Sequence, residues 1–309
     1  MAKPKPVGFP PEGEELPSPV ADNHTHFTIG ADAAVELPEG VESLPMDVQI
    51  ARAARAGVVA MIHSGCELPG LQAAVDLARA HDAVAAAIAI HPNEAPRHAG
   101  VREVGPDGWE PRFLPHHETD LDDAVGRVAE IAEASRGLVV AIGETGLDNF
   151  RAGDKGRAVQ RRAFRAHIEI AKELGLPLQI HDREAHAEVL DVLRRDGAPE
   201  RTVFHCFSGD RELAEIVSRN GWYASFAGPI TFRTNDELRD ACRHIDPSRV
   251  LVETDAPYLT PAPYRGRPNA PYLMTHTVRA IAQALELELT QTCQVLLANT
   301  RRVYGQWWS

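Results

Sequence analysis

Histidine and carboxylate side chains stand at the ends of apolar runs in this sequence. Residues 22–26 read Asp-Asn-His-Thr-His. Because strand side chains alternate, Asp22, His24 and His26 are expected on one face of a strand. Two imidazoles two positions apart can bind one divalent ion, and a neighbouring acid can orient a ligand through a hydrogen bond. The segment by itself fits equally a pair of surface histidines at a strand end.

Four later apolar runs end in the same way, in Glu144, His181, His205 and Asp255. In a closed parallel barrel these ends meet at the C-terminal mouth, where barrel enzymes carry their chemistry. A zinc site takes about three or four protein ligands. Six donors therefore suffice for two ions that share a bridging carboxylate: His24, His26, Glu144, His181, His205 and Asp255. Two ions ~4 Å apart can generate hydroxide and hold both oxygens of a hydrolysis, and phosphodiester cleavage suits them best.

Other charged residues follow the same runs and are candidates for substrate binding. His91 ends the third run and has no place in the six-ligand set, so we interpret it as a substrate-facing group, with a buried hydrogen-bonded histidine as the alternative. Arg183, Arg265 and Arg267 could contact phosphate oxygens. For each arginine the alternative is an ordinary solvated charge.

Short apolar runs alternate with amphipathic helix patterns along the chain, which indicates parallel strands separated by helices. Eight such strands predict a (β/α)8 barrel or an open doubly wound sheet. The absence of a Gly-x-Gly-x-x-Gly motif after the first strand disfavours a nucleotide-binding sheet. The expected strands are Val20–His26, Gly57–His63, Val84–His91, Leu138–Gly143, Leu178–His181, Thr202–His205, Tyr223–Phe226 and Val250–Glu253. Between them, Asp210 and Thr234 are expected to cap helices.

Two segments lie outside this alternation. Residues 1–19 contain six prolines and little apolar content, which predicts a flexible or draped extension before a single domain over 20–309. Residues 92–120 exceed ordinary loop length and are expected to form a surface insertion or a wall of the site. The histidines outside the strand-end set are interpreted as surface or structural residues: His63, His81, His98, His116, His117, His167, His186, His244 and His276.

Composition excludes several classes of protein. Apolar residues make up 44% and charged residues 25%, as in globular proteins, so a disordered or fibrous chain is excluded. The balance of 32 basic against 44 acidic residues gives −12, which argues against a broad basic surface that coats nucleic acid. No apolar run approaches ~18 residues. The scattered cysteines favour a reducing cytoplasm, and an acidic barrel of this kind is expected to be a monomer.

Seven segments, in family order between Asp22 and about Tyr304, resemble the TatD family of metal-dependent deoxyribonucleases, a branch of the amidohydrolase-like barrels. The resemblance implies a TIM-like barrel with a binuclear metal site at its C-terminal mouth. The segments are Asp22–Phe27, Ala89–Pro92, Ile142–Asp148, Leu176–Arg183, His205–Gly209, Glu253–Leu259 and Arg265–Asn269. The proline-rich start, the insertion at 92–120 and Asn149-Phe150 depart from the family pattern.

The resemblance also implies which residues hold the metals. His24, His26 and Asp255 would bind one divalent ion and His181 and His205 a second, with Glu144 as the bridge. The ions could be Zn, Mn, Mg, Co or Ni. The implied reaction is 3′-to-5′ removal of nucleotides from single-stranded DNA, with Asp255 orienting the attacking hydroxide.

Two other functions compete with the nuclease. A small-molecule amidohydrolase or phosphotriesterase-like enzyme could use the same metals, although many of these bridge their ions with a carbamylated lysine, and the fourth strand offers Glu144 instead. A catalytically idle scaffold is the other alternative, and it need not bind two ions.

Overall fold

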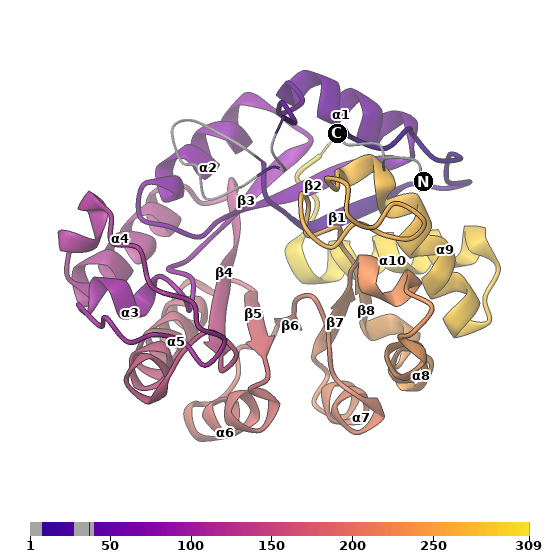
Figure 1. Ribbon diagram of the computed structural model, residues 1–309. Helices are drawn as coiled ribbons and strands as arrows, with labels where there is room; N and C mark the ends of the chain where they lie inside the picture. The colour runs from indigo at the N-terminus through magenta and orange to yellow at the C-terminus, as the bar shows by residue number, and fades with distance from the viewer. Residues whose placement is uncertain (1–7, 28–36, 38–39, 309) are drawn as a thin grey trace, which may run out of the picture.

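The computed structural model of the chain describes residues 8–27, 37 and 40–308. Eight parallel strands follow one another in chain order around a barrel, and the helices surround them (Figure 1). The predicted (β/α)8 fold is confirmed. The strands are β1 (Val20–Thr25), β2 (Val58–Gly65), β3 (Val84–Ile88), β4 (Val139–Asp148), β5 (Leu178–Arg183), β6 (Thr202–Phe204), β7 (Tyr223–Phe226) and β8 (Val250–Val252).

Amphipathic helices cover the outside of the strands. Phe164, Ile168 and Ala171, spaced at i, i+4 and i+7, are all buried on one face of α5. Asp210 caps α7 as expected, since its carboxylate accepts the N–H of Leu213 at 2.9 Å. The helices are α1 (Met46–Arg55), α2 (Gly70–Ala80), α3 (Ala95–His98), α4 (Leu121–Ala134), α5 (Asp154–Leu174), α6 (His186–Asp196), α7 (Arg211–Arg219), α8 (Asp236–His244), α9 (Met274–Leu285) and α10 (Leu289–Tyr304). Short 3-10 turns are η1 (Pro115–Glu118), η2 (Gly228–Thr231), η3 (Pro247–Arg249) and η4 (Pro271–Leu273).

The expected cap at Thr234 is wrong. Helix α8 begins at Asp236, so Asn235 occupies the N-cap position, and the Thr234 hydroxyl bonds only to the Asn235 side chain, at 3.4 Å. Asn235 turns its amide to the carbonyl of Pro229, at 3.1 Å. The side chain at the N-cap position therefore bonds to the preceding turn and does not cap the helix.

Strand β4 continues five residues beyond the end predicted for it. Its second half, Glu144–Asp148, pairs with β5 after a register shift that follows Ile142. Gly146 has φ 145°, and a Cβ atom at this position would collide with the carbonyl oxygen of His181. The glycine therefore lets the two strands approach closely where they carry Glu144 and His181.

Backbone hydrogen bonds join β1 to the segment after β8 at the mouth of the barrel. The N–H of Asp255 donates to the carbonyl of His24 at 2.9 Å, and the N–H of His26 donates to Ala256 at 2.7 Å. Asn23 points outward and donates its amide to the carbonyl of Val252 at 2.7 Å. These hydrogen bonds between β1 and residues 252–256, called the seam below, fix His24 and His26 beside Asp255.

Residues 8–19 of the proline-rich segment before β1 lie against the barrel. This is the draped form of the predicted extension, and not the flexible form. Leu16 is 4% exposed and donates its N–H to Ala56 at the end of α1. The hydroxyl of Tyr272 donates to the carbonyl of Pro10 at 2.7 Å. Residues 1–7 of the predicted extension lie outside the described residues.

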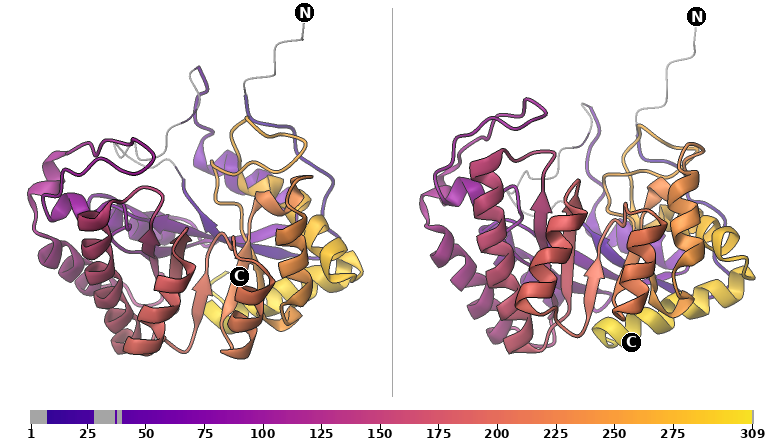
Figure 2. Two further views of the ribbon diagram at one scale, coloured as in Figure 1. Left: turned by 60° about the horizontal axis from the view of Figure 1, so that its bottom comes forward. Right: turned by 90° about the horizontal axis from the view of Figure 1, so that it is seen from below.

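The insertion at residues 92–120 and the loop after β8 stand at the same end of the barrel (Figure 2). Figure 2 shows the insertion between β3 and β4 and the loop after β8 at the end toward which the strand arrows point. The insertion contains α3 and η1. It thus stands beside the mouth of the barrel.

Candidate metal centre

Glu144 lies between two groups of histidines at the mouth of the barrel. Its Oε1 is 3.7 Å from His24 Nε2 and 3.5 Å from His26 Nε2. Its Oε2 is 3.0 Å from His181 Nδ1 and 2.9 Å from His205 Nε2. The two carboxylate oxygens therefore face different imidazoles, which is compatible with a carboxylate shared by two cations.

Asp255 completes the first group. Its Oδ1 lies 3.4 Å from His26 Nε2 and 3.8 Å from His24 Nε2, and one potential ligand atom of each residue lies within 4.8 Å of the others. Asp255 has φ 53°, a left-handed conformation that costs energy for a residue other than glycine. The seam to β1 holds this turn and aims the carboxylate at the two histidines.

Two side chains without a predicted role orient the imidazoles. His24 Nδ1 lies 3.1 Å from Gln179 Oε1, and His205 Nδ1 lies 2.9 Å from Glu253 Oε1. Each acceptor places the proton on Nδ1 and leaves the Nε2 lone pair facing Glu144, as a metal ligand requires. Gln179 stands two positions before His181 on the same face of β5, and Glu253 follows β8 directly. The alternation with His181 and the position after β8 were the available signals.

Asp22 does not orient an imidazole, which corrects the expectation for it. Its Oδ1 accepts the backbone N–H of Thr254 at 2.9 Å and that of His24 at 3.3 Å. Asp22 is fully buried and acts across the seam between β1 and the end of β8. Its effect on the centre passes through the backbone that carries His24 and Asp255.

The charges of the centre suit a cation. Burial alone would raise the pKa of Glu144, but the surrounding imidazoles, His205 and His91 first, hold it well below its usual range. Burial would lower the pKa of His205, yet Glu253 and Glu144 raise it well above its usual value. Protons and a divalent ion compete for the same lone pairs, so ionised carboxylates among protonatable histidines are compatible with a site where metal replaces protons.

His181 bridges two carboxylates. Its Nδ1 faces Glu144, and its Nε2 lies 3.1 Å from Asp148 Oδ2. Burial opposes the charged form, but the two acids raise the pKa of His181 to about 9. Asp148 also accepts the amide of Asn93 at 3.0 Å. Asp148 ends the Ile142–Asp148 segment and had no predicted role.

Comparison with known proteins identifies the family of the chain. Residues 21–305 match the family model for TatD-related DNases. The chain belongs to the TatD family. It is 37% identical to an uncharacterized metal-dependent hydrolase of Mycobacterium tuberculosis, TatD, over 94% of this chain and 99% of that protein. Identity with YcfH, an uncharacterized metal-dependent hydrolase of Escherichia coli K12, is 32% over 92% of this chain and 95% of the relative.

A solved structure agrees with this assignment. YJJV, a TatD homologue from Escherichia coli K12, superposes with a TM-score of 0.76 at 25% identity and covers 93% of this chain and 98% of its own. The chain is thus an enzyme of the hydrolase class, and its histidine and carboxylate cluster is compatible with the metal dependence of its relatives. Within the described residues, no helix has the length and apolar character needed to cross a membrane.

In this TatD-family chain, His91 and Cys66 also face the bridging carboxylate. His91 Nε2 is 3.7 Å from Glu144 Oε1, while its Nδ1 accepts the N–H of Asn93 at 2.9 Å. Burial lowers the pKa of His91 to about 4, so the ring is neutral at pH 7 and carries its proton on Nε2. Cys66 Sγ lies 3.6 Å from Glu144 Oε1. Cys66 follows β2 directly, a strand-end signal that was overlooked in the sequence.

The three predicted substrate arginines differ in their surroundings. Arg183 is exposed, with Cζ 3.9 Å from the centre of the Phe150 ring, and Arg265 is exposed, with Cζ 4.0 Å from that of Phe232. Arg267 instead donates from Nε and Nη2 to the carbonyls of Gly8 and Phe9, at 2.7 and 2.6 Å. Arg267 therefore anchors the N-terminal segment, and its contact with substrate stays a prediction.

Proposed function

We propose that this TatD-family hydrolase is a two-metal phosphodiesterase that removes nucleotides from the 3′ ends of single-stranded DNA. The carboxylate of Glu144 carries the proposal, because its two oxygens face different histidine pairs at 2.9–3.7 Å. A site for one ion would need only one of these pairs.

Each donor then has a role. One ion would be bound by His24, His26 and Asp255, and the other by His181 and His205, with Glu144 shared between them. Such ions supply a hydroxide at neutral pH and neutralise charge on a phosphate. The imidazole-rich set suits Zn, Mn, Co or Ni better than Mg.

Two further side chains are placed to assist the reaction. Asp255 is held in its ionised form, since His26 and the neighbouring histidines lower its pKa against the effect of burial. It can orient the attacking water and accept its proton. His91, neutral and protonated on Nε2, can donate a hydrogen bond to a phosphate oxygen.

A nucleic-acid substrate is supported by the rim of the mouth as well as by the family. Arg183 and Arg265 each stack on an aromatic ring and remain exposed. A cation beside an aromatic face can contact a phosphate while the ring stacks on a base. The rim thus supplies local positive charge on a chain whose net charge is −12.

The test is digestion of 5′-labelled single-stranded DNA by protein reconstituted with zinc or manganese. We expect a ladder that shortens from the 3′ end. Asp255→Asn should lose at least ~100-fold in rate, the usual contribution of general acid–base catalysis. Asp82→Asn is the matched control, because Asp82 is exposed and precedes β3 at the opposite end of the barrel. Full activity of Asp255→Asn would reject the role of Asp255.

A panel of amides, lactones and phosphotriesters, offered to the same metal-loaded protein, tests the small-molecule alternative. We expect no turnover of the panel. Turnover of a panel member without digestion of DNA would replace the nuclease by an amidohydrolase or phosphotriesterase-like function. Cuts in the middle of the DNA chain would reject the exonuclease action but retain the phosphodiesterase.

A further inference from the structure

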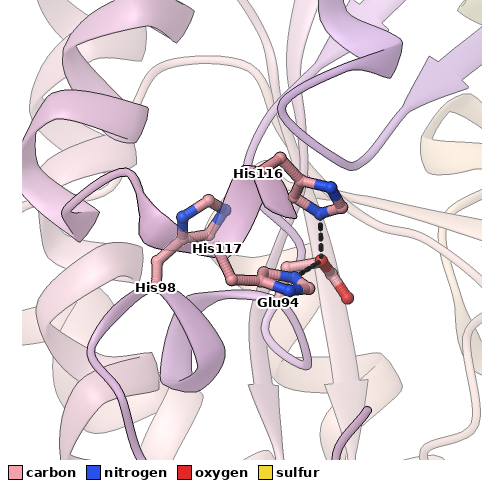
Figure 3. Close-up of side chains that lie close together, drawn as sticks. All are labelled: Glu94, His98, His116 and His117. Carbon is pink, nitrogen blue, oxygen red and sulfur yellow. Dashed lines mark hydrogen bonds and ion pairs between the residues drawn. The ribbon is translucent and has the colours of Figure 1, made fainter. Parts of the chain in front are cut away.

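A second cluster of potential metal ligands lies in the insertion between β3 and β4. Glu94 and His98 come from the start and end of the α3 region, and His116 and His117 from η1. One potential ligand atom of each lies within 4.8 Å of the others. Figure 3 shows the rings of His116 and His117 at the carboxylate of Glu94, with the ring of His98 on the other side of His117. None of the four belongs to the centre around Glu144.

His98 is the decisive member because it has a buried nitrogen without a partner. Its Nδ1 lies 2.8 Å from the carbonyl oxygen of Thr119, an acceptor, so Nδ1 carries the proton and Nε2 carries a lone pair. The residue is 4% exposed, and Nε2 has no hydrogen-bond partner among the described residues. A buried unsatisfied acceptor costs about 1–3 kcal/mol, so a ligand for this nitrogen is expected.

Arg97 and His117 hold the carboxylate of Glu94 in place. Arg97 Nη1 donates to Oε1 at 2.6 Å. His117 accepts the N–H of Leu114 on Nδ1 at 2.8 Å and therefore donates from Nε2 to Glu94 Oε2 at 2.7 Å. Both contacts orient the carboxylate, as partners of metal-ligating acids do.

His116 contributes the remaining imidazole. Its Nε2 lies 3.4 Å from Glu94 Oε2, a distance at the outer limit of a hydrogen bond, and the ring packs 4.0 Å from that of His117. Two imidazoles and a carboxylate from separate turns thus converge on one point. This donor set is the one that zinc and similar ions take at three-ligand sites.

We propose that Glu94, His98 and His116 form a third metal site, separate from the two-ion centre, which binds a zinc-like divalent ion. His117 is a positioning residue that holds Glu94 through its Nε2–H. The ion would provide the missing partner of His98 Nε2. It would also connect α3 to η1 and close the loop between residues 94 and 116, which forms a wall beside the mouth of the barrel.

Metal content tests the proposal directly. Protein equilibrated with excess zinc and desalted is analysed by elemental mass spectrometry. We expect His98→Ala/His116→Ala to hold one ion per chain fewer than the wild type. The control His244→Ala removes a partly buried histidine of α8, outside both clusters, and should match the wild type. An unchanged ion count in the double variant would overturn the site and leave a hydrogen-bonded cluster only.

A second readout reports on the insertion itself. Limited proteolysis between residues 99 and 114 should be slower with zinc than after chelation in the wild type, and insensitive to zinc in the double variant. If the double variant does not fold, Glu94→Gln, which keeps the side-chain shape, decides by the same ion count and protease assay. Zinc protection retained in Glu94→Gln together with a wild-type ion count would likewise overturn the proposal. Neither measurement depends on the substrate of the enzyme.

Discussion

Glu253 illustrates how a residue outside the ligand set can control the candidate centre. Its Oε1 accepts from His205 Nδ1 at 2.9 Å and from the N–H of Cys206 at 2.7 Å. Glu253 is 1% exposed, so its charge acts on His205 with little screening by water. The carboxylate thereby fixes the direction of the imidazole and increases its basicity.

We expect Glu253→Gln to weaken metal binding by at least ~10-fold, in the range measured for partners of metal-ligating histidines. The amide keeps the shape of the side chain but removes the charge that supports His205. The measurement is competition for zinc against a chelator, with Glu237→Gln on the exposed face of α8 as the control. Equal zinc affinity in wild type and Glu253→Gln would show that Glu253 has no such role.

The six proposed ligands could be predicted from sequence because each one stands at or just after the end of an apolar run. The partners of these ligands could not be predicted in the same way. Gln179 and Glu253 have ordinary residue types for a strand end, and only the ring orientation of the neighbouring histidines reveals their role. The anchoring contacts of Arg267 could not be predicted, because its partners, Gly8 and Phe9, come from the opposite end of the chain.

At the scale of elements, sequence patterns located all eight strands but misplaced several strand ends. Apolar periodicity reports on burial, whereas a strand ends where backbone pairing ends. The second half of β4 is polar and glycine-containing, yet it pairs with β5 as far as Asp148. The insertion shows the same limit, because His98, His116 and His117 converge only through the fold of α3 and η1.

His167 of α5 binds the helix to the segment after β3 and makes stability depend on pH. Its Nε2 accepts the N–H of Ile90 at 3.2 Å, and its Nδ1 lies 2.8 Å from the carbonyl oxygen of Ala163. Burial lowers the pKa of His167 from 6.5 to about 4. Below pH 6.5 His167 takes up a proton in the unfolded chain but stays neutral in the native state. The free energy of unfolding therefore falls by up to about 3 kcal/mol as the pH approaches 4.

His167→Gln removes this titration. At pH 7.5 the variant should be less stable than the wild type by roughly 1–3 kcal/mol, because buried hydrogen bonds are lost. The difference should shrink as the pH falls to 5, since only the wild type loses stability through this residue. Urea unfolding with excess chelator at both pH values measures it, and His81→Gln is the partly exposed control. A difference that stays constant with pH would contradict the assignment.

At the scale of the whole molecule, the N-terminal segment connects parts of the barrel that are distant in sequence. It contacts α1 through Leu16 and Ala56, and the loop after β8 through Arg267. Composition predicted only that this segment lacks regular structure. Its path could not be predicted, because single backbone carbonyls receive the arginine and tyrosine side chains and leave no pattern in the sequence.

Leu16→Ala tests whether this segment contributes to the stability of the barrel. Leu16 is 4% exposed and packs into the main hydrophobic core, so truncation should cost about 2–5 kcal/mol of unfolding free energy. Val48→Ala, at a 41% exposed position of α1, should cost much less. The hydrolytic rate per folded molecule should not change, because Leu16 lies outside the candidate metal centre. Urea unfolding that gives the same free energy for Leu16→Ala and Val48→Ala would mean that the segment only rests on the surface.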